Sequence, residues 1–377
     1  MEEYDVVVVG AGPCGSAAAK KAAEKGMKTI MIEEHAEIGY PEHCPGVLAK
    51  TICSRGFLEE LVDMIDPRAV VSRLKALRIY APSGRVVETT PEKTSVFARV
   101  ERKLFDRELA KLAANAGADV VVNTGVTSLI TEDGVVRGVN TNSKDMPKVY
   151  GKVVISAQGY RAQMTGIPKW EGLTREGLRF SPPMLTLYVT GVKDIDPGIV
   201  EFHLGHGSIF PCDDTSCLTG ARSLSDFEAF KARDCVMSKK LRDCKVVGIK
   251  GFSGMPAPRI LLPKKVKDGL ILAGDAAGFI GIETTIASGR DAAEVAAEAI
   301  KAGDVTEKQL SKFEGLCQEL AANIELFNRQ WEEVMRYDRL SSEDEMEKRF
   351  REREPDVLGT IDTLTPSYVI QMQSAFK

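Results

Sequence analysis

The amino-acid sequence predicts an α/β protein that begins with a Rossmann-type unit, and three features near the amino terminus indicate it. Residues 5–9, DVVVV, are a β-branched run typical of a strand buried on both faces. A glycine-rich turn at 10–15, GAGPCG, leads into an alanine-rich segment at 16–25 that favours a helix. A second apolar run at 28–32 ends at Glu33. This order of strand, GxGxxG turn, helix, strand and acid is the signature of a dinucleotide-binding unit.

The residue types in this signature suit the chemistry of a nucleotide. Gly10 allows the tight turn, Gly12 lets the backbone approach a pyrophosphate, and Gly15 permits close packing of the helix on the strand. The helix N-terminus faces the phosphates, and the Glu33 carboxylate is suited to bind ribose hydroxyls. Cys14 lies inside the turn, where a small side chain is required, and we expect it to fill space.

Composition bounds the class of protein. A chain of 377 residues is long for one core, so two or three packed domains are expected. Lys and Arg total 50 against 54 for Asp and Glu, and this net charge of −4 argues against nucleic acid as a partner. The eight cysteines form no CxxC pair, and no signal peptide precedes the first strand, so reduced thiols in a cytoplasmic protein are expected. No apolar run reaches the roughly 18 residues of a transmembrane helix, and peripheral membrane contact stays open.

Two further motifs favour FAD over NAD. Residues 268–277, DGLILAGDAA, predict a turn, a short strand and then GDAA at the start of a helix. This pattern resembles the second FAD motif of flavoproteins of the p-hydroxybenzoate hydroxylase type, in which the aspartate, here Asp275, binds a ribitol hydroxyl. Residues 101–109, ERKLFDREL, are similar to a helix start in the same flavoproteins whose arginine, here Arg102, reaches the cofactor. Residues 116–126 then predict the next parallel strand.

Within that superfamily the chain resembles the geranylgeranyl reductase family, which includes archaeal digeranylgeranylglycerophospholipid reductases. The likeness rests on the amino-terminal fingerprint, on Glu33 and on the segments 42–48, 101–120 and 270–277. It implies FAD as cofactor and the saturation of isoprenoid double bonds in membrane lipids by reduced FAD. In the family a loop of the form RCxGxx approaches the flavin, and HCPG at 43–46 matches it with histidine in place of arginine. The FAD-binding residues that the resemblance implies are Gly10, Gly12, Gly15, Glu33, Glu34, His43, Cys44, Gly46, Arg102, Val126, Asp275, Gly281 and Ile282.

Three segments depart from the family pattern. After GDAA the family has a proline and a glycine-rich run around the isoalloxazine, whereas residues 278–285 are GFIGIETT. The family's YxWxFP-like motif of the lipid pocket is HGSIFP at 206–211, which keeps FP and loses both aromatics. The usual ADG is AQG at 157–159. These changes predict an intact FAD-binding frame with a remodelled reaction chamber.

The chain is expected to divide into three parts. A discontinuous FAD-binding domain is predicted at 1–70, 101–170 and 251–303, an antiparallel substrate or cap domain at 71–100 and 171–250, and a helical region at 304–377. Within the first, residues 127–155 predict an antiparallel hairpin that turns at 132–134. In the last, a helix from Thr306, with Gln309 completing a capping box, carries a stripe made of Leu310, Phe313, Cys317, Leu320, Ile324, Phe327, Trp331 and Val334.

Two pairs of polar residues invite other chemistry. His203 and His206 suggest a metal, but an offset of three on a strand points them to opposite faces, and no further ligands complete a shell. Cys212 and Cys217 flank a turn-like stretch, so a surface hairpin is favoured over a redox pair. No metal site is therefore predicted.

The leading hypothesis is an FAD-dependent reductase that acts on an apolar isoprenoid or lipid substrate, with Cys44 as the catalytic proton donor and His43 beside it. Because no second GxGxxG is present, electrons are expected from a ferredoxin-like protein or a reduced diffusible cofactor. The alternatives are a flavin electron-transfer subunit resembling electron-transfer-flavoprotein dehydrogenases, an FAD-dependent hydroxylase, and a non-catalytic FAD-binding protein. The charged run at 341–354 would suit a redox-complex partner or a solvated helix.

Overall fold

The computed structural model describes most of the chain up to residue 321. The described residues are 3–42, 44–49, 57–89, 96–159, 179–180, 184–204, 206–253, 256–257, 261–262, 264–279, 281–318 and 320–321, with isolated positions at 342, 344–345, 347–348 and 351. Within them the strands form three main sheets. None of the helices in this part of the chain has the length and apolar content needed to span a lipid bilayer.

The largest sheet is the predicted parallel one. Its strand order is β19-β20-β11-β1-β2-β8, and the pairs β20–β11, β11–β1, β1–β2 and β2–β8 are all parallel. Strand β2 is buried along its whole length, and β1 and β11 are buried over their last four residues, as their β-branched sequences predict. The bounds are β1 Glu3–Val9, β2 Thr29–Ile32, β8 Asp119–Val121, β9 Val126–Glu132, β10 Val135–Thr141, β11 Lys148–Ser156, β19 Val266–Lys267 and β20 Leu270–Leu272.

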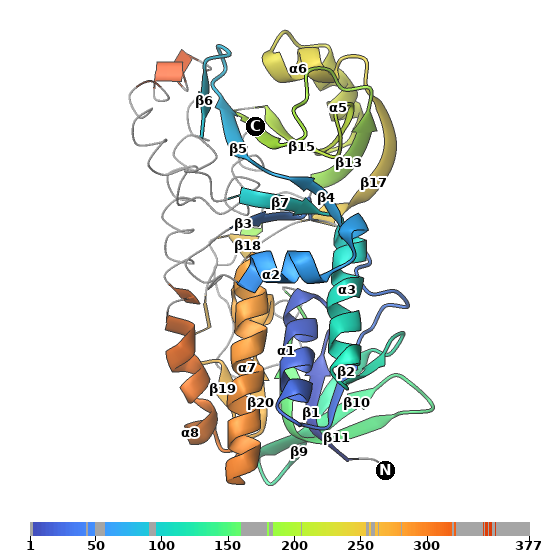
Figure 1. Ribbon diagram of the computed structural model, residues 1–377, viewed down its shortest axis with the longest axis vertical. Coiled ribbons are helices and arrows are strands. Elements are labelled where there is room, and N and C mark those ends of the chain that lie inside the picture. The colour runs from blue at the N-terminus through green and yellow to red at the C-terminus, as the bar shows by residue number, and fades with distance from the viewer. Residues whose placement is uncertain are drawn as a thin grey trace.

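Three helices pack together beside this sheet. Helix α1 (Pro13–Glu24) lies between α3 (Arg102–Asn115) and α7 (Ile282–Ala302) (Figure 1). Alanines on α1 and α7 are almost fully buried, which lets the two backbones approach closely. These helices place the starts of α1, α3 and α7 toward the same end of the sheet (Figure 1).

The second sheet has seven strands in the order β17-β13-β16-β15-β14-β5-β6. Most pairs are antiparallel as expected, but β5 and β14 run parallel, so the predicted all-antiparallel sheet is mixed. Two short helices that the strand pattern did not predict, α5 (Leu224–Lys231) and α6 (Val236–Leu241), cover one face. The strands are β5 Ala76–Tyr80, β6 Val86–Glu88, β13 Met184–Thr190, β14 Ile199–His203, β15 Gly207–Pro211, β16 Ser216–Ala221 and β17 Lys245–Ser253.

A small sheet of three strands lies between the parallel sheet with its helices and the seven-stranded sheet (Figure 1). Strand β7 (Val96–Val100) is its centre, with β3 (Val47–Ala49) and β4 (Val70–Arg73) on either side. Helix α2 (Phe57–Met64) and a 3-10 turn, η2 (Pro67–Ala69), connect β3 to β4. A two-stranded pair, β12 (Arg179–Phe180) with β18 (Pro256–Ala257), completes the strands.

Of the local predictions near the large sheet, some are confirmed and others are wrong. The hairpin is confirmed, since β9 and β10 are antiparallel around 133–134, and β10 then pairs with β11. GDAA forms a 3-10 turn, η3 (Gly274–Ala277), and α7 begins only at Ile282. Helix α8 (Glu307–Leu310) has Thr306 as N-cap, but the threonine side chain makes no capping bond, so the capping box is wrong.

The apolar stripe of the carboxy-terminal helix is buried as far as the structure describes it. Leu310, Phe313, Cys317 and Leu320 join the main core with exposed fractions of 0–1%. The rest of the predicted stripe, Ile324, Phe327, Trp331 and Val334, lies outside the described residues, as does most of the charged run at 341–354.

Candidate FAD site

The GxGxxG turn forms a tight passage from strand to helix. Gly10 has a φ of +97°, and a Cβ there would lie 2.6 Å from the carbonyl oxygen of Ala157. A Cβ on Gly15 would lie 1.8 Å from the carbonyl oxygen of Gly10. Both positions therefore require glycine, one for its backbone conformation and one for the close contact of helix α1 with the turn.

Gly12 differs from its two neighbours because a Cβ there would meet no atom within 4 Å. It is the N-cap of α1, where the first backbone N–H groups of the helix point outward and the helix dipole favours an anion. Open space in front of a helix N-terminus, reached over a residue without a side chain, fits the pyrophosphate of FAD.

Glu33 lies across from this turn at the end of β2. Its Oε2 accepts a hydrogen bond from the backbone N–H of Ala11 at 2.8 Å. Its Oε1 accepts from the backbone N–H of His35 at 3.0 Å and lies 2.7 Å from Nδ1 of that residue. The carboxylate is thereby fixed at the carboxyl end of the parallel strands, where a ribose would be bound.

Glu34 and Val126, two further residues predicted to contact FAD, differ in exposure. The Glu34 side chain is 61% exposed, and Val126 is half-buried at the first residue of β9. The loop before Val126 is tied to the acid-bearing segment, because the Thr124 N–H donates to the Glu33 carbonyl at 2.9 Å. The segments that carry Glu34 and Val126 are therefore joined by a backbone hydrogen bond.

The second FAD motif packs directly on the first. Gly274 has a φ of +63°, and a Cβ there would lie 2.8 Å from Sγ of Cys14. A Cβ on Gly289 of α7 would lie 2.2 Å from the carbonyl oxygen of Cys14. Burial raises the pKa of the Cys14 thiol far above its ordinary value, which agrees with its predicted role as a filler of space. Asp275 belongs to the same turn as Gly274 and so lies close to the start of α1.

The loop at residues 39–46 is held against β7 and α3 by two glycines with positive φ. A Cβ on Gly39 would lie 2.8 Å from Cα of Lys103, and a Cβ on Gly46 would lie 2.1 Å from the carbonyl oxygen of Val100. The Val100 N–H also donates to the Gly46 carbonyl at 2.8 Å. The loop that carries Cys44 is thus anchored beside the start of α3.

Cys44 is half-buried at the meeting point of three distant segments. Its Sγ accepts from the backbone N–H of Gly46 at 3.5 Å and also interacts with the Arg102 side chain. Arg102 in turn donates from Nε and Nη2 to Asp106 at 2.9 and 2.8 Å. Although burial opposes its charge, Asp106 and Cys44 raise the pKa of Arg102 above its ordinary value.

The same cysteine packs against the apolar cluster that contains Ile282 and Ile286 of α7. Gly281, with a φ of +93°, is the N-cap of that helix. The structure therefore brings together Cys44, Arg102, Gly281 and Ile282, which the sequence places far apart. His43 lies outside the described residues.

A polar cluster that the sequence did not predict lies next to this loop. Lys250 of β17 donates to Glu42 Oε2 at 2.7 Å and also bonds Glu101, so one cation joins the loop, the start of α3 and the seven-stranded sheet. Burial raises the pKa of Glu42, and the neighbouring Glu101 adds to this effect. The three residues are distant in sequence, so no local pattern could have revealed them.

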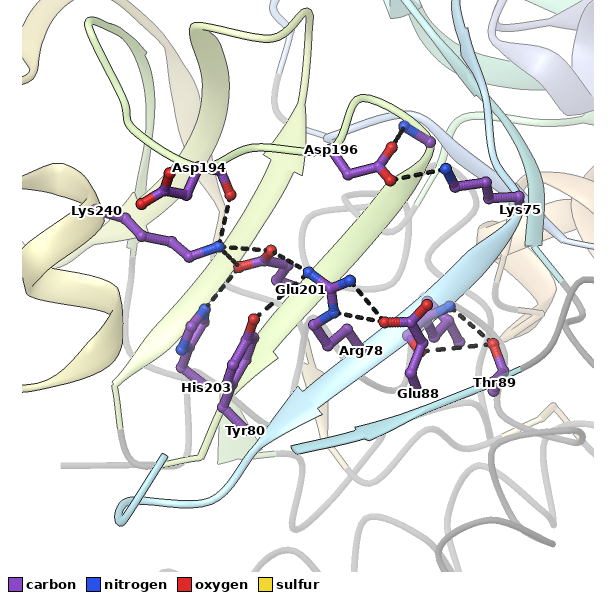
Figure 2. A network of polar contacts seen from close by, with 12 residues as sticks. Lys75, Arg78, Tyr80, Glu88, Thr89, Asp194, Asp196, Glu201, His203 and Lys240 are labelled. Atoms are coloured by element: carbon purple, nitrogen blue, oxygen red, sulfur yellow. Dashed lines mark hydrogen bonds and ion pairs between the residues drawn. The ribbon is translucent and has the colours of Figure 1, made fainter. Parts of the chain in front are cut away.

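A second unpredicted cluster occupies the helix-covered side of the seven-stranded sheet (Figure 2). Glu201, only 1% exposed, accepts from Lys240 Nζ at 2.7 and 2.9 Å and from Arg78 Nη1 at 3.2 Å. His203 Nε2 lies 3.1 Å from Glu201 Oε2, and the imidazole stacks on Tyr80 at 4.3 Å between ring centroids. This cluster ties α6 to β14 and β5.

The cluster accounts for His203, one of the two histidines that suggested a metal. His203 is the last residue of β14, whereas His206 follows the strand and lies 5.9 Å from the ring of Phe230. The argument from strand faces does not apply to His206, because the chain has already turned there. Across the described ranges, no three His, Cys, Asp or Glu residues gather closely enough to hold a metal ion.

The cysteines at 212 and 217 flank a turn. Asp213 Oδ1 accepts from the backbone N–H groups of Thr215 and Ser216 at 2.8 and 2.7 Å, and the Cys212 N–H donates to the Ser216 carbonyl at 2.8 Å. Cys212 is half-buried, Cys217 is fully buried, and both are free thiols. The structure thus forms the hairpin turn that the sequence favoured.

Comparison with known proteins identifies the chemistry of the site. A family model described as FAD dependent oxidoreductase matches residues 5–198. A digeranylgeranylglycerophospholipid reductase of Methanocella arvoryzae is 36% identical over 344 residues, which cover 84% of this chain and 83% of the relative. A digeranylgeranylglycerophospholipid reductase of Methanosarcina acetivorans is 34% identical over 357 residues, which cover 89% of this chain and 82% of the relative.

Solved structures agree with these relatives. A geranylgeranyl bacteriochlorophyll reductase-like protein of Thermoplasma acidophilum has a TM-score of 0.79 and 29% identity, and the match covers 99% of this chain and 96% of that one. A myxobacterial chondrochloren halogenase of the FAD-dependent class has a TM-score of 0.67 at 19% identity, which shows a shared fold alone.

Proposed function

The chain belongs to the geranylgeranyl reductase family of FAD-dependent oxidoreductases, and from this premise we propose that it saturates carbon–carbon double bonds in the isoprenoid chains of a membrane lipid. The names of its relatives support this substrate class. The single observation that carries the proposal is the convergence of Cys44, Arg102 and the start of α7 beside the nucleotide-binding turn.

The proposal assigns a role to each part of the site. Bound and reduced FAD supplies the hydride. Cys44 donates the proton that completes saturation, and Arg102, fixed by Asp106, orients the thiol. The residues that we propose to bind FAD are Gly10, Gly12, Gly15, Glu33, Glu34, His43, Cys44, Gly46, Arg102, Val126, Asp275, Gly281 and Ile282.

The organisation of the chain follows the same proposal. Residues 1–70, 101–170 and 251–303 form the FAD-binding domain, 71–100 and 171–250 form the substrate domain, and 304–377 form a helical region. Electrons come from a ferredoxin-like protein or a reduced diffusible cofactor, because the sequence has no second GxGxxG for a nicotinamide. A lipid substrate also favours peripheral contact with the membrane surface.

The test is purification without oxygen, followed by a flavin spectrum, reduction by dithionite and incubation with a geranylgeranyl glycerol ether lipid. The expected product gains two hydrogens for each double bond, detected by mass spectrometry. A colourless protein without affinity for FAD would defeat the proposal.

Cysteine variants test the proton donor. Because general acid catalysis contributes about 10²–10⁴-fold, we expect Cys44→Ala to retain FAD and to lose activity by roughly 10²-fold or more. Cys244→Ala is the control, since Cys244 is buried beneath α5 and α6. Normal turnover by Cys44→Ala would remove the proposed role of the thiol.

A further inference from the structure

The two faces of the small three-stranded sheet differ in character. Leu48 and Ala98, which are paired in register, lie in the apolar cluster that includes Phe105 of α3 and Ile286 of α7. Successive side chains of a strand alternate between faces. Arg99 therefore lies on the opposite face of β7, in a strand whose other residues are apolar.

Arg99 and Ser72 share that opposite face. Ser72 of β4 is the register partner of Arg99, and residues paired across strands have neighbouring side chains. Arg99 is only 1% exposed. Among the described residues, neither Nε nor Nη1 of Arg99 nor the Oγ of Ser72 has a hydrogen-bond partner.

Such an arrangement destabilises a folded chain unless something binds there. Buried polar groups are nearly always hydrogen-bonded, and an uncompensated buried charge costs several kcal/mol. Residues that violate this rule are expected mainly at functional sites. Two unpartnered polar side chains in adjacent positions indicate a ligand that accepts hydrogen bonds.

The charge of Arg99 itself favours an anionic ligand. Glu101, two residues after Arg99 and just past the end of β7, is already bonded to Lys250, which also binds Glu42. The charge of Arg99 acts on Glu101 and on the nearby Cys212 thiol through space. Lys250 is bonded to both carboxylates of the cluster, Glu42 and Glu101. The donors of Arg99 that have no partner within the described ranges belong to a cation, and an acceptor with negative charge suits them.

We propose that Arg99 and Ser72 bind the phosphate headgroup of the lipid substrate, on the face of the small sheet opposite Ala98 and Leu48. This inference rests on the proposed reduction of a lipid and names the polar end of that lipid. A phosphate oxygen accepts hydrogen bonds from guanidinium and hydroxyl donors, and charge-assisted bonds of this kind are the strong ones. The isoprenoid chain then extends toward the flavin and Cys44.

The test compares two ligands with identical chains, an isoprenoid glycerol ether ending in phosphate and the same ether ending in a free hydroxyl. Each is titrated in detergent micelles into the oxidised holoenzyme, and binding is read from the flavin absorption spectrum. We expect the wild type to bind the phosphate ether at least tenfold more tightly. Arg99→Met is expected to bring that ratio close to one with unchanged FAD content, and Ser72→Ala to lower it less.

Arg73→Met is the matched control, because Arg73 belongs to the same small sheet but is 59% exposed and pairs with Asp63. It should keep the wild-type ratio. A second readout separates ligand binding from structure: an arginine that only supports the fold would lower the melting temperature when replaced. Arg99→Met without ligand should instead melt at or above the wild-type temperature, since a buried unpaired charge is removed.

Two results would overturn the inference. One is an unchanged phosphate preference in Arg99→Met. The other is competition by inorganic phosphate without any preference between the two ethers, which would assign the site to a free anion. Turnover is measured separately with dithionite-reduced enzyme, so failure to saturate either ether would defeat the proposed function, while the binding ratio would still decide the role of Arg99.

Discussion

The buried ionic cluster around Glu201 allows a stringent test of how the seven-stranded sheet is stabilised (Figure 2). Glu201→Gln keeps the size of the side chain and removes its charge. Arg78 retains a partner after this change, because its Nε donates to Glu88 at 2.6 Å. Lys240 keeps only neutral acceptors, the carbonyl oxygen of Asp194 at 2.8 Å and the amide oxygen of the new glutamine, and loses its anionic partner. The substitution therefore mainly affects Lys240, whose buried charge, on a side chain that is 9% exposed, loses its ion-pair partner.

The size of the effect follows from that asymmetry. Removing one partner of a buried ion pair costs about 3–5 kcal/mol, because the other charge is left uncompensated. Glu201→Gln is therefore expected to lower the free energy of unfolding by about 3–5 kcal/mol. Lys240→Met should cost less, about 1–3 kcal/mol, since Glu201 still accepts from Arg78 and lies beside His203. The double variant should cost less than the sum of the two.

The assay is equilibrium denaturation in urea, followed by circular dichroism on protein with full FAD content. The wild type, the two single variants and the double variant form a double-mutant cycle. Their four unfolding free energies give the coupling energy between Glu201 and Lys240. A cost below about 1 kcal/mol for Glu201→Gln, or strictly additive single variants, would refute the reasoning that the pair is desolvated and coupled.

Three further outcomes follow from the geometry. Gly15→Ala should fail to fold, because its Cβ would lie 1.8 Å from a carbonyl oxygen, whereas Gly12→Ala should fold and bind FAD more weakly; expression level and flavin content distinguish them. Glu33→Gln should weaken FAD binding by roughly tenfold through loss of charge-assisted bonds, measured by flavin fluorescence. Burial lowers the pKa of His203, although Glu201 opposes this, so the unfolded chain binds that proton more readily than the folded protein. Stability should therefore be full above about pH 6.5 and fall below it, and urea denaturation should show a flatter pH profile for His203→Gln.

The first half of the fold could be predicted because its determinants are local. The β1–α1–β2 unit is defined by a continuous stretch in which strand, turn, helix and acid follow one another. The parallel strand β8 was also predicted, and β20 was predicted as a strand without its direction, since each is an apolar run next to a recognisable helix or turn. GDAA was placed correctly but its helix was not, because residues 278–281 contain two glycines with positive φ that interrupt it.

The seven-stranded sheet could be predicted only as a set of strands. The parallel pairing of β5 with β14 joins residues 123 positions apart, such as Ala76 and Ile199, and no local pattern encodes it. Strands β4 and β7 belong to the small sheet rather than to the seven-stranded one. They are joined there by β3, which follows the loop bearing Cys44. Long-range pairings of this kind are set by side-chain packing rather than by strand propensity.

The candidate reaction chamber shows the same limit, and it also shows where a signal was present. The segment that replaces the family's aromatic motif places Phe210 in the main core, edge-on to Phe202 at 5.9 Å, while His206 lies by Phe230 of α5. His206 and Phe210 therefore lie in different surroundings, and together they do not form a substitute for the two aromatic residues of the family motif. The run VFARV at 96–100 did contain a signal, because a buried apolar strand has no structural need for a cation. Sequence alone could not interpret that arginine, because its unpartnered neighbour, Ser72, and the carboxylate that Lys250 binds are brought to it only by the fold. An enzyme for a lipid must accommodate an apolar chain and a charged head within one protein. A buried cation whose Nε and Nη1 find no hydrogen-bond partner in the described part of the chain is suited to the second requirement.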